Sequence, residues 1–204
     1  IFRFSGADGS QARFDIGESM AYLQPTKTGA GTPAILAGTE DGFVILDKDG
    51  NRLWESAYTD WSGAELGVVR VLNDLNQDGV SDLMMQFADR IVVARSGGTS
   101  PLGFETHLSI PAGENIAFEF KELTGDIDGD AVQEIAYFES TGDDVAAKAT
   151  SSVLLVVSPV SGKVLHQWTM PVTADLACAD LNGDGFRDSL VHRQVPKKQM
   201  ASQD

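Results

Sequence analysis

The sequence predicts an all-β protein built from repeated units of four antiparallel strands. Two observations lead to this prediction. A nine-residue acidic loop occurs three times, with its copies starting 52 and then 54 residues apart. Between the copies lie apolar runs of strand length, which are joined in pairs by turns that contain glycine. A content of 42% hydrophobic residues with 21 glycines suits a soluble, turn-rich β protein.

The repeated loop has the spacing of a calcium site. Its clearest copy, over residues 180–188, reads D-x-N-x-D-G-x-x-D, and residues 74–82 and 126–134 are variants of it. We call these the first (74–82), second (126–134) and third (180–188) loops, and number their positions 1 to 9. Calcium takes about six to eight oxygen ligands, from carboxylates, amides and backbone carbonyls. Side chains at positions 1, 3 and 5 of a tight loop can converge on one point, and glycine at position 6 permits the sharp turn.

The carbonyl of position 7 and the acid of position 9 would complete each site, so we expect up to three Ca²⁺ ions, one per loop. The expected ligands of the first loop are Asp74, Asn76, Asp78, the carbonyl of Val80, and Asp82. Those of the second loop are Asp126, Asp128, Asp130, the carbonyl of Val132, and Glu134. Those of the third loop are Asp180, Asn182, Asp184, the carbonyl of Phe186, and Asp188.

The alternative interpretation of any one copy is a polar turn, because Asn, Asp and Gly are common turn residues. Three copies at a nearly constant period, each with an acid at position 9, favour the metal site. The second loop departs most, with Ala131 in place of the turn glycine and Glu134 in place of aspartate. These changes predict a distorted, weaker or differently filled site. Its four carboxylates still favour a cation, since they would repel one another without one.

An EF-hand shares the first half of this pattern but needs a glutamate at position 12 and a helix on each side. The residues at position 12 are Met85, Tyr137 and Val191. The flanking segments, such as residues 67–72 and 82–87, have the composition of strands. The sequence therefore excludes an EF-hand.

The hairpins between the loops complete the repeat. Residues 42–54 form the clearest one, with Asp49-Gly50 between two apolar runs and Trp54 at its end. Residues 153–168 repeat it with Ser161-Gly162 and Trp168, and residues 90–98 and 1–14 supply two further hairpins. Residues 23–33 join two strand-like runs but carry no acids at ligand positions, so we assign no metal there.

Units of four strands repeating every 40–60 residues or so are typical of β-propeller blades. We expect one propeller segment with a half blade at 1–17, full blades at 18–60, 61–112 and 113–172, and a half blade at 173–204. Propellers usually close with about 4–8 blades. The chain is therefore either part of a larger propeller, which we favour, or its terminal strand pairs together complete a fourth blade.

The strand–loop–strand unit resembles the FG-GAP (VCBS-type) repeat of integrin α-chain propellers, most closely at Asp180 to Gly185. The hairpins at 38–54 and 153–168 are similar to the strand pairs of quinoprotein-like propellers. The resemblance implies calcium binding by the loops and an integrin-like role in adhesion. Gln77, Ala131 and Glu134 depart from the repeat, and no clear Phe-Gly/Gly-Ala-Pro pair is present.

Charge and composition restrict the partners and the compartment. A net charge of −15 argues against nucleic acid and anionic membrane as partners, and ten of the 30 acids lie in the three loops. No apolar run approaches the roughly 18 residues that span a bilayer. Cys178 is the one cysteine, which excludes an intrachain disulfide. Because such loops fill where calcium is abundant, we expect an extracellular, periplasmic or cell-surface location. An open segment would expose sheet edges and tend to associate.

No catalytic motif is recognisable, and the three histidines have no ligand spacing. We expect a calcium-stabilised propeller module of a secreted or cell-surface protein that binds a protein or a glycan. The first alternative is the propeller part of an extracellular enzyme, either a polysaccharide lyase or a quinoprotein-like dehydrogenase, with catalytic residues partly outside this segment. The second is a purely structural scaffold in an assembly. Trp54 and Trp168, at matching hairpin positions, are expected in the blade core.

Overall fold

The computed structural model describes residues 2–4, 11–13, 20–62, 64–97, 102–113, 116–141, 151–170, 174–181 and 188–193. In these ranges the regular structure is β-strand, apart from two single-turn 3-10 helices at Gly29–Gly31 and Tyr58–Asp60. The all-β prediction is confirmed.

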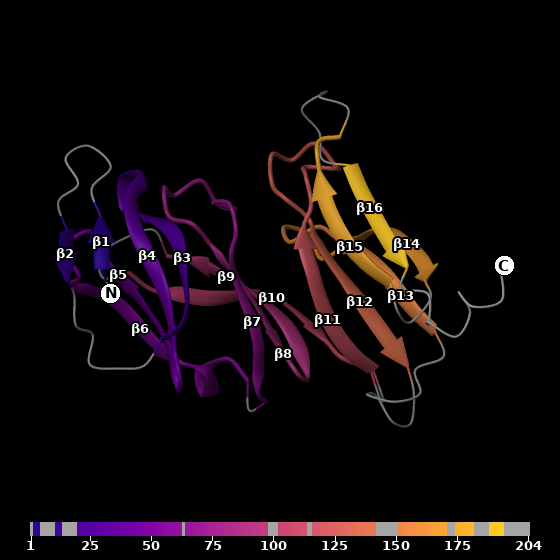
Figure 1. The fold of residues 1–204 in the computed structure, drawn as a ribbon, viewed down its shortest axis with the longest axis horizontal. Helices are drawn as coiled ribbons and strands as arrows, with labels where there is room; N and C mark the ends of the chain where they lie inside the picture. The colour runs from indigo at the N-terminus through magenta and orange to yellow at the C-terminus, as the bar shows by residue number, and fades with distance from the viewer. Residues whose placement is uncertain are drawn as a thin grey trace, which may run out of the picture.

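The strands form three four-stranded antiparallel sheets and two two-stranded ones (Figure 1). The first four-stranded sheet contains β3 (Met20–Thr28), β4 (Thr32–Thr39), β5 (Gly42–Leu46) and β6 (Arg52–Ala57). The second contains β7 (Leu66–Val71), β8 (Leu83–Phe87), β9 (Arg90–Ser96) and β10 (Phe104–Pro111). The third contains β11 (Ile116–Leu123), β12 (Ile135–Thr141), β13 (Ser151–Val157) and β14 (Val164–Met170). In each sheet the strands are neighbours in chain order.

The remaining strands form separate pairs at opposite ends of the molecule. β1 (Phe2–Phe4) pairs with β2 (Gln11–Arg13), and β15 (Ala174–Ala179) pairs with β16 (Asp188–Arg193). Figure 1 shows the first pair, in indigo, at one end of the long axis and the second, in yellow, near the other. The terminal pairs do not join into a fourth four-stranded sheet, which was one of the two arrangements expected from the sequence.

The sheets stack face to face, with an apolar core in each gap. Four of the five residues of strand β8 are apolar, and they do not alternate with polar residues. Its residues Leu83, Met85 and Phe87 pack in the core shared with the first sheet, whereas Met84 packs in the core shared with the third. All four are 0% exposed. A strand that is buried on both faces carries apolar residues on both of them.

Two glutamine side chains join neighbouring sheets through hydrogen bonds. Strands β7 and β11 are each the end strand of a sheet, so each has backbone groups on an edge that no strand pairs. The side-chain amide of Gln24 on β3 donates to the Val69 carbonyl of β7 at 2.7 Å and accepts from the Val71 N–H at 3.1 Å.

Gln86 on β8 makes the equivalent pair of bonds to β11, donating to the Phe118 carbonyl at 3.1 Å and accepting from the Phe120 N–H at 2.7 Å. Each amide therefore satisfies one backbone N–H and one backbone carbonyl of the edge strand, as a paired strand would. The sheets are held in register by these polar contacts as well as by their apolar cores.

The connection between β3 and β4 is shorter than the sequence suggested. Strand β3 continues through Pro25 to Thr28, so only Gly29–Gly31 links the two strands. The Thr32 hydroxyl donates to the Gly29 carbonyl at 3.1 Å, and Gly31 has a positive φ of 70°.

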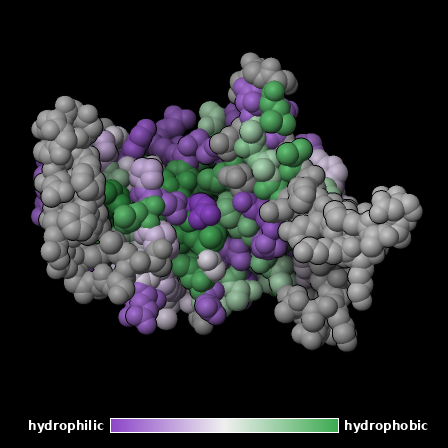
Figure 2. Space-filling view, in the orientation of Figure 1, coloured by the Kyte–Doolittle hydropathy of each residue, from purple (hydrophilic) through white to green (hydrophobic). Residues whose placement is uncertain are grey.

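Figure 2 shows the face of the molecule that is seen in Figure 1. Green apolar residues lie at the middle of this face, over the second sheet, with purple hydrophilic residues among and around them. Within the described ranges, no helix has the length and apolar character that crossing a membrane requires.

Candidate metal centre

The repeated loops connect the first two strands of each repeat. The first loop runs from β7 to β8, the second from β11 to β12, and the third from β15 to β16. Strands rather than helices therefore flank all three, in agreement with the exclusion of an EF-hand. In the third loop Asp180, Leu181 and Asp188 are described, whereas Asn182, Asp184 and Phe186 lie outside the described residues.

One hydrogen bond is common to the three loops: the N–H of position 2 donates to the carboxylate of position 9. These bonds are Leu75 to Asp82 at 2.7 Å, Ile127 to Glu134 at 2.7 Å, and Leu181 to Asp188 at 3.1 Å. The acid of position 9 therefore closes each loop across its base.

The aspartate of position 1 organises the turn. Asp74 accepts from the N–H groups of Asp78 at 3.1 Å and Gly79 at 2.7 Å. Asp126 accepts from the N–H groups of Asp130 at 3.1 Å and Ala131 at 2.8 Å. The two loops share the same internal framework.

Position 7 anchors each described loop to the core. The side chains of Val80 and Val132 are 1% and 6% exposed. Their N–H groups donate to the carboxylates of Asp78 at 2.7 Å and Asp130 at 2.8 Å.

Positions 4 and 6 both require the left-handed backbone conformation. The φ angles are 60° at Gln77 and 87° at Gly79 in the first loop, and 85° at Gly129 and 67° at Ala131 in the second. The first and second loops thus each have glycine at one of the two positions and a strained residue at the other. Ala131 keeps the left-handed turn that glycine makes in the first loop. The need for glycine at position 4 was not recognised in the sequence.

Replacing Ala131 by glycine should stabilise the protein by about 1 kcal/mol, because the left-handed conformation is less favourable for alanine by about that amount. Urea unfolding in EDTA would measure this change. Gly79→Ala is the matched control and should destabilise by a similar amount. A destabilising Ala131→Gly substitution would contradict the strain argument.

The second loop brings four carboxylates together. One oxygen from each of Asp126, Asp128, Asp130 and Glu134 lies within 4.8 Å of the others. Glu134 is 0% exposed, and its Oε1 has no hydrogen-bond partner. A buried acidic oxygen without a donor is destabilising unless a proton or a cation satisfies it. The four oxygens could therefore hold a metal ion.

The first loop satisfies its acids differently. Asp82 is also 0% exposed, but its second oxygen accepts from the Ser96 N–H at 2.8 Å. The Ser96 hydroxyl donates to Asp78 at 2.6 Å, and the Ser96 carbonyl accepts from the Asn76 side chain at 3.0 Å. Ser96 is thus a residue of this loop's environment that the sequence did not reveal, because it comes from strand β9.

Burial raises the pKa of the acid at position 9 in the first and second loops. It raises the pKa of Glu134 to about 7, with the neighbouring acids Asp128, Asp126 and Asp130 adding to the effect and the Ile127 N–H opposing it. Burial likewise raises the pKa of Asp82 to about 6, although the N–H groups of Ser96 and Leu75 lower it in part.

This elevation predicts how calcium-free stability depends on pH. An acid with a higher pKa in the folded chain stabilises the fold while it is protonated, and loses this stabilisation as pH rises through the folded value. In EDTA the unfolding temperature should therefore fall between about pH 4.5 and 7 because of Glu134. A Glu134→Gln variant measured over the same range should show a shallower fall. Identical slopes for the two proteins would contradict this assignment.

Two cavities accompany the loops and the first sheet. One, of about 600 Å³, is lined by Gln24 and Lys27 of β3, Asp74 of the first loop and Ala131 of the second. The end of β3 and the connection to β4 also bond to the first loop. The Ser81 N–H donates to the Lys27 carbonyl and the Gly31 N–H donates to the Gly79 carbonyl, both at 3.1 Å. The first loop is therefore supported by the sheet that precedes it.

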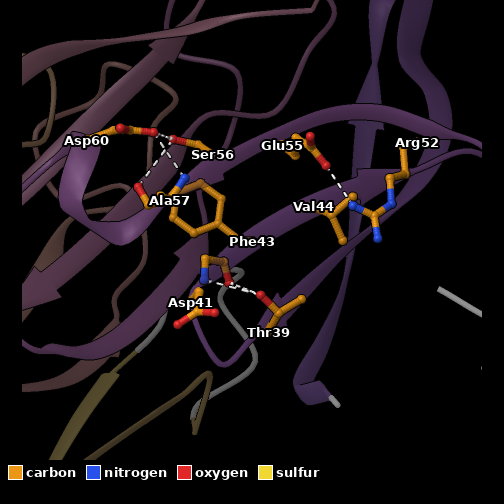
Figure 3. Close-up of a pocket in the computed structure, with 10 residues that line it drawn as sticks. Thr39, Asp41, Phe43, Val44, Arg52, Glu55, Ser56, Ala57 and Asp60 are labelled. Carbon is orange, nitrogen blue, oxygen red and sulfur yellow. Dashed lines mark hydrogen bonds and ion pairs between the residues drawn. The ribbon is translucent and has the colours of Figure 1, made fainter. Parts of the chain in front are cut away.

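The other cavity, of about 380 Å³, lies on the first sheet (Figure 3). Two of its acids are engaged by neighbours: Asp60 accepts from the Ser56 hydroxyl and the Ala57 N–H, and Glu55 pairs with Arg52. These contacts hold the end of β6 in place.

Two histidines and the two hairpin tryptophans differ in their surroundings. The His107 ring contacts the Val160 carbonyl at 2.8 Å, and the His166 ring stacks on Trp168, so neither is paired with an acid in these contacts. Trp54 is half-buried and packs against the core, with its ring centroid 4.7 Å from that of Phe104 in the next sheet. The core prediction is wrong for Trp168, which is 44% exposed. The sheet that follows it has two strands in the described ranges, so no outer strand covers this ring.

No protein-family model matches this sequence, and no curated protein matches it.

Proposed function

We propose that the chain is a calcium-stabilised β-propeller module of a secreted or cell-surface protein that binds a protein or a glycan. One observation carries the metal part of the proposal. The Oε1 of Glu134 is buried without a donor, in a loop where three other carboxylates approach it.

The propeller assignment is supported by how the sheets repeat. Three successive sheets have the same strand order, and their stacked faces share continuous cores. Contacts between the first strands, β3 with β7 and β11 with β15, place these strands on one side of the stack. In a propeller the corresponding strand of each blade lines the central channel.

Asp126, Asp128, Asp130, the carbonyl of Val132 and Glu134 would hold the ion in the second loop. The calcium would supply positive charge that offsets the repulsion among the carboxylates and satisfies the buried oxygen. All of these ligands come from one nine-residue loop, so the role that fits them is to fix the loop rather than to activate a substrate.

A structural role also suggests the compartment. Extracellular modules bind calcium with dissociation constants of about 10⁻⁴–10⁻³ M, which are matched to the calcium outside cells. A loop of this kind would be filled there and empty in a cytosol.

The exposed pair of His166 and Trp168 supports the binding part of the proposal. Their ring centroids lie 5.2 Å apart with an interplanar angle of 21°, which gives a flat aromatic surface on the outer strand β14. Such surfaces suit the apolar face of a sugar or an aromatic side chain of a protein partner.

A glycan microarray probed with the calcium-loaded chain would test this part. We expect Trp168→Ala to reduce binding about tenfold or more, as a buried aromatic contact does at other interfaces. Gln167→Ala, on the opposite face of the same strand, is the control and should bind normally. Equal binding by all three proteins would exclude Trp168 as the contact.

A further inference from the structure

The register of the strands identifies equivalent residues beside the first and second loops. Leu83, which follows position 9 of the first loop, pairs with Ala94. Ile135, which follows position 9 of the second loop, pairs with Val157. Counted two residues beyond these pairs, the position of Ser96 at the end of β9 corresponds to Pro159, which lies in the turn after β13.

Ser96 satisfies the first loop with three separate groups. Its N–H bonds to Asp82, its hydroxyl bonds to Asp78, and its carbonyl accepts from Asn76. Ser96 is 2% exposed, so water does not compete strongly for these bonds. Among the described residues, the acids of the first loop do not form a group of converging ligand oxygens like that of the second.

Pro159 provides neither donor to the second loop. Proline has no N–H and no hydroxyl. The oxygen that lacks a partner in the second loop, Oε1 of Glu134, is the one equivalent to the Asp82 oxygen that Ser96 satisfies. In both loops the other oxygen of the acid accepts the N–H of position 2. Apart from the substitutions within the loops themselves, the two loops differ in this one residue, Ser96 or Pro159, outside the loop.

We infer that Ser96 and Pro159 determine which loop depends on calcium. Ser96 closes the first loop with protein hydrogen bonds, so that this loop keeps its shape without a cation. Pro159 leaves the second loop unsatisfied, so that this loop requires one and binds it more tightly. This inference rests on the proposed calcium binding. It adds the order of calcium affinity of the two loops and the residues that determine that order.

Calcium titration by calorimetry tests the ranking, with Asp180→Asn as the background so that the third loop does not contribute. In this background, Asp126→Asn should remove the tightest calcium-binding step. Asp78→Asn should leave that step in place and change its dissociation constant by less than about twofold. Equal losses from the two substitutions would overturn the inference.

Substitutions at the two equivalent positions test the cause. Pro159→Ala restores the N–H alone, and Pro159→Ser restores both donors, so each should weaken calcium binding at the second loop, by about tenfold for a bond to a charged group. Each should also raise the unfolding temperature in EDTA. Unchanged calcium affinity in both variants would overturn the assignment to Pro159.

Ser96→Ala removes the hydroxyl from the first loop. It should lower the unfolding temperature in EDTA and enlarge the increase that calcium produces. A calcium response equal to that of the parent protein would count against the role of Ser96. If the unsubstituted chain shows neither binding heat nor a calcium-dependent melt, calcium binding itself fails. If calcium binds but the loops rank equally, only this inference fails.

Discussion

Replacing Gln86 by leucine is expected to lower the free energy of unfolding by about 2–4 kcal/mol. The substitution keeps a similar volume but removes both bonds to β11, and it leaves the Phe118 carbonyl and the Phe120 N–H without partners. An unsatisfied buried polar group destabilises a protein by about 1–3 kcal/mol. Urea unfolding in saturating calcium, which keeps the loops in one state, would measure the change.

The matched control is Gln167→Leu, because Gln167 is also a strand glutamine but is exposed. It should change stability by less than about 0.5 kcal/mol, as surface substitutions usually do. A loss below about 1 kcal/mol for Gln86→Leu would mean that the sheets are joined by their apolar cores alone.

Replacing Phe43 by alanine is expected to lower the free energy of unfolding by about 3–5 kcal/mol, the usual effect of truncating a core phenylalanine. Phe43 is 2% exposed and is the centre of an aromatic group in the core between the first two sheets. Its ring lies 5.2 Å from Trp54, 5.7 Å from Tyr58 and 6.4 Å from Trp61. The cavity that alanine leaves would be bordered by rigid rings that cannot readily close it.

Leu53→Ala in the adjacent strand β6 is the control, since Leu53 is 37% exposed. Its effect on the midpoint of urea unfolding should be small. If both substitutions have the same effect, the aromatic group is not a core between the sheets, and the stacking of the first sheet on the second must be reconsidered.

The strands were predictable because local signals determine them. Apolar runs bounded by turn residues gave four strands in each of three repeats, and Asp49-Gly50 marked a hairpin turn in which Gly50 has a φ of 84°. The left-handed position 4 of the loops was missed, since Gln77 occupies it in the first loop and gives no signal of a turn.

Contacts between sheets were not predictable from local patterns. Gln24 and Gln86 resemble ordinary polar strand residues in the sequence, and only the stacking of the sheets places them against an unpaired edge. Ser96 and Pro159 lie 14 and 25 residues beyond position 9 of their loops, so no fixed spacing connects them to the acids. The exposure of Trp168 depends on a neighbouring sheet rather than on its own hairpin.

Thermal unfolding of the purified chain in EDTA and across a calcium titration tests the central claim most directly, with magnesium as the control. For a site with a dissociation constant of about 0.1 mM, calcium at about 10 mM should stabilise the fold by about 2.7 kcal/mol. For a chain of this size that corresponds to an increase in unfolding temperature of about 5–10 °C. Magnesium should produce a much smaller increase, because it gives up its water ligands reluctantly. A folded chain whose unfolding temperature is the same in EDTA and in calcium would contradict the account, and the loops would then be polar turns.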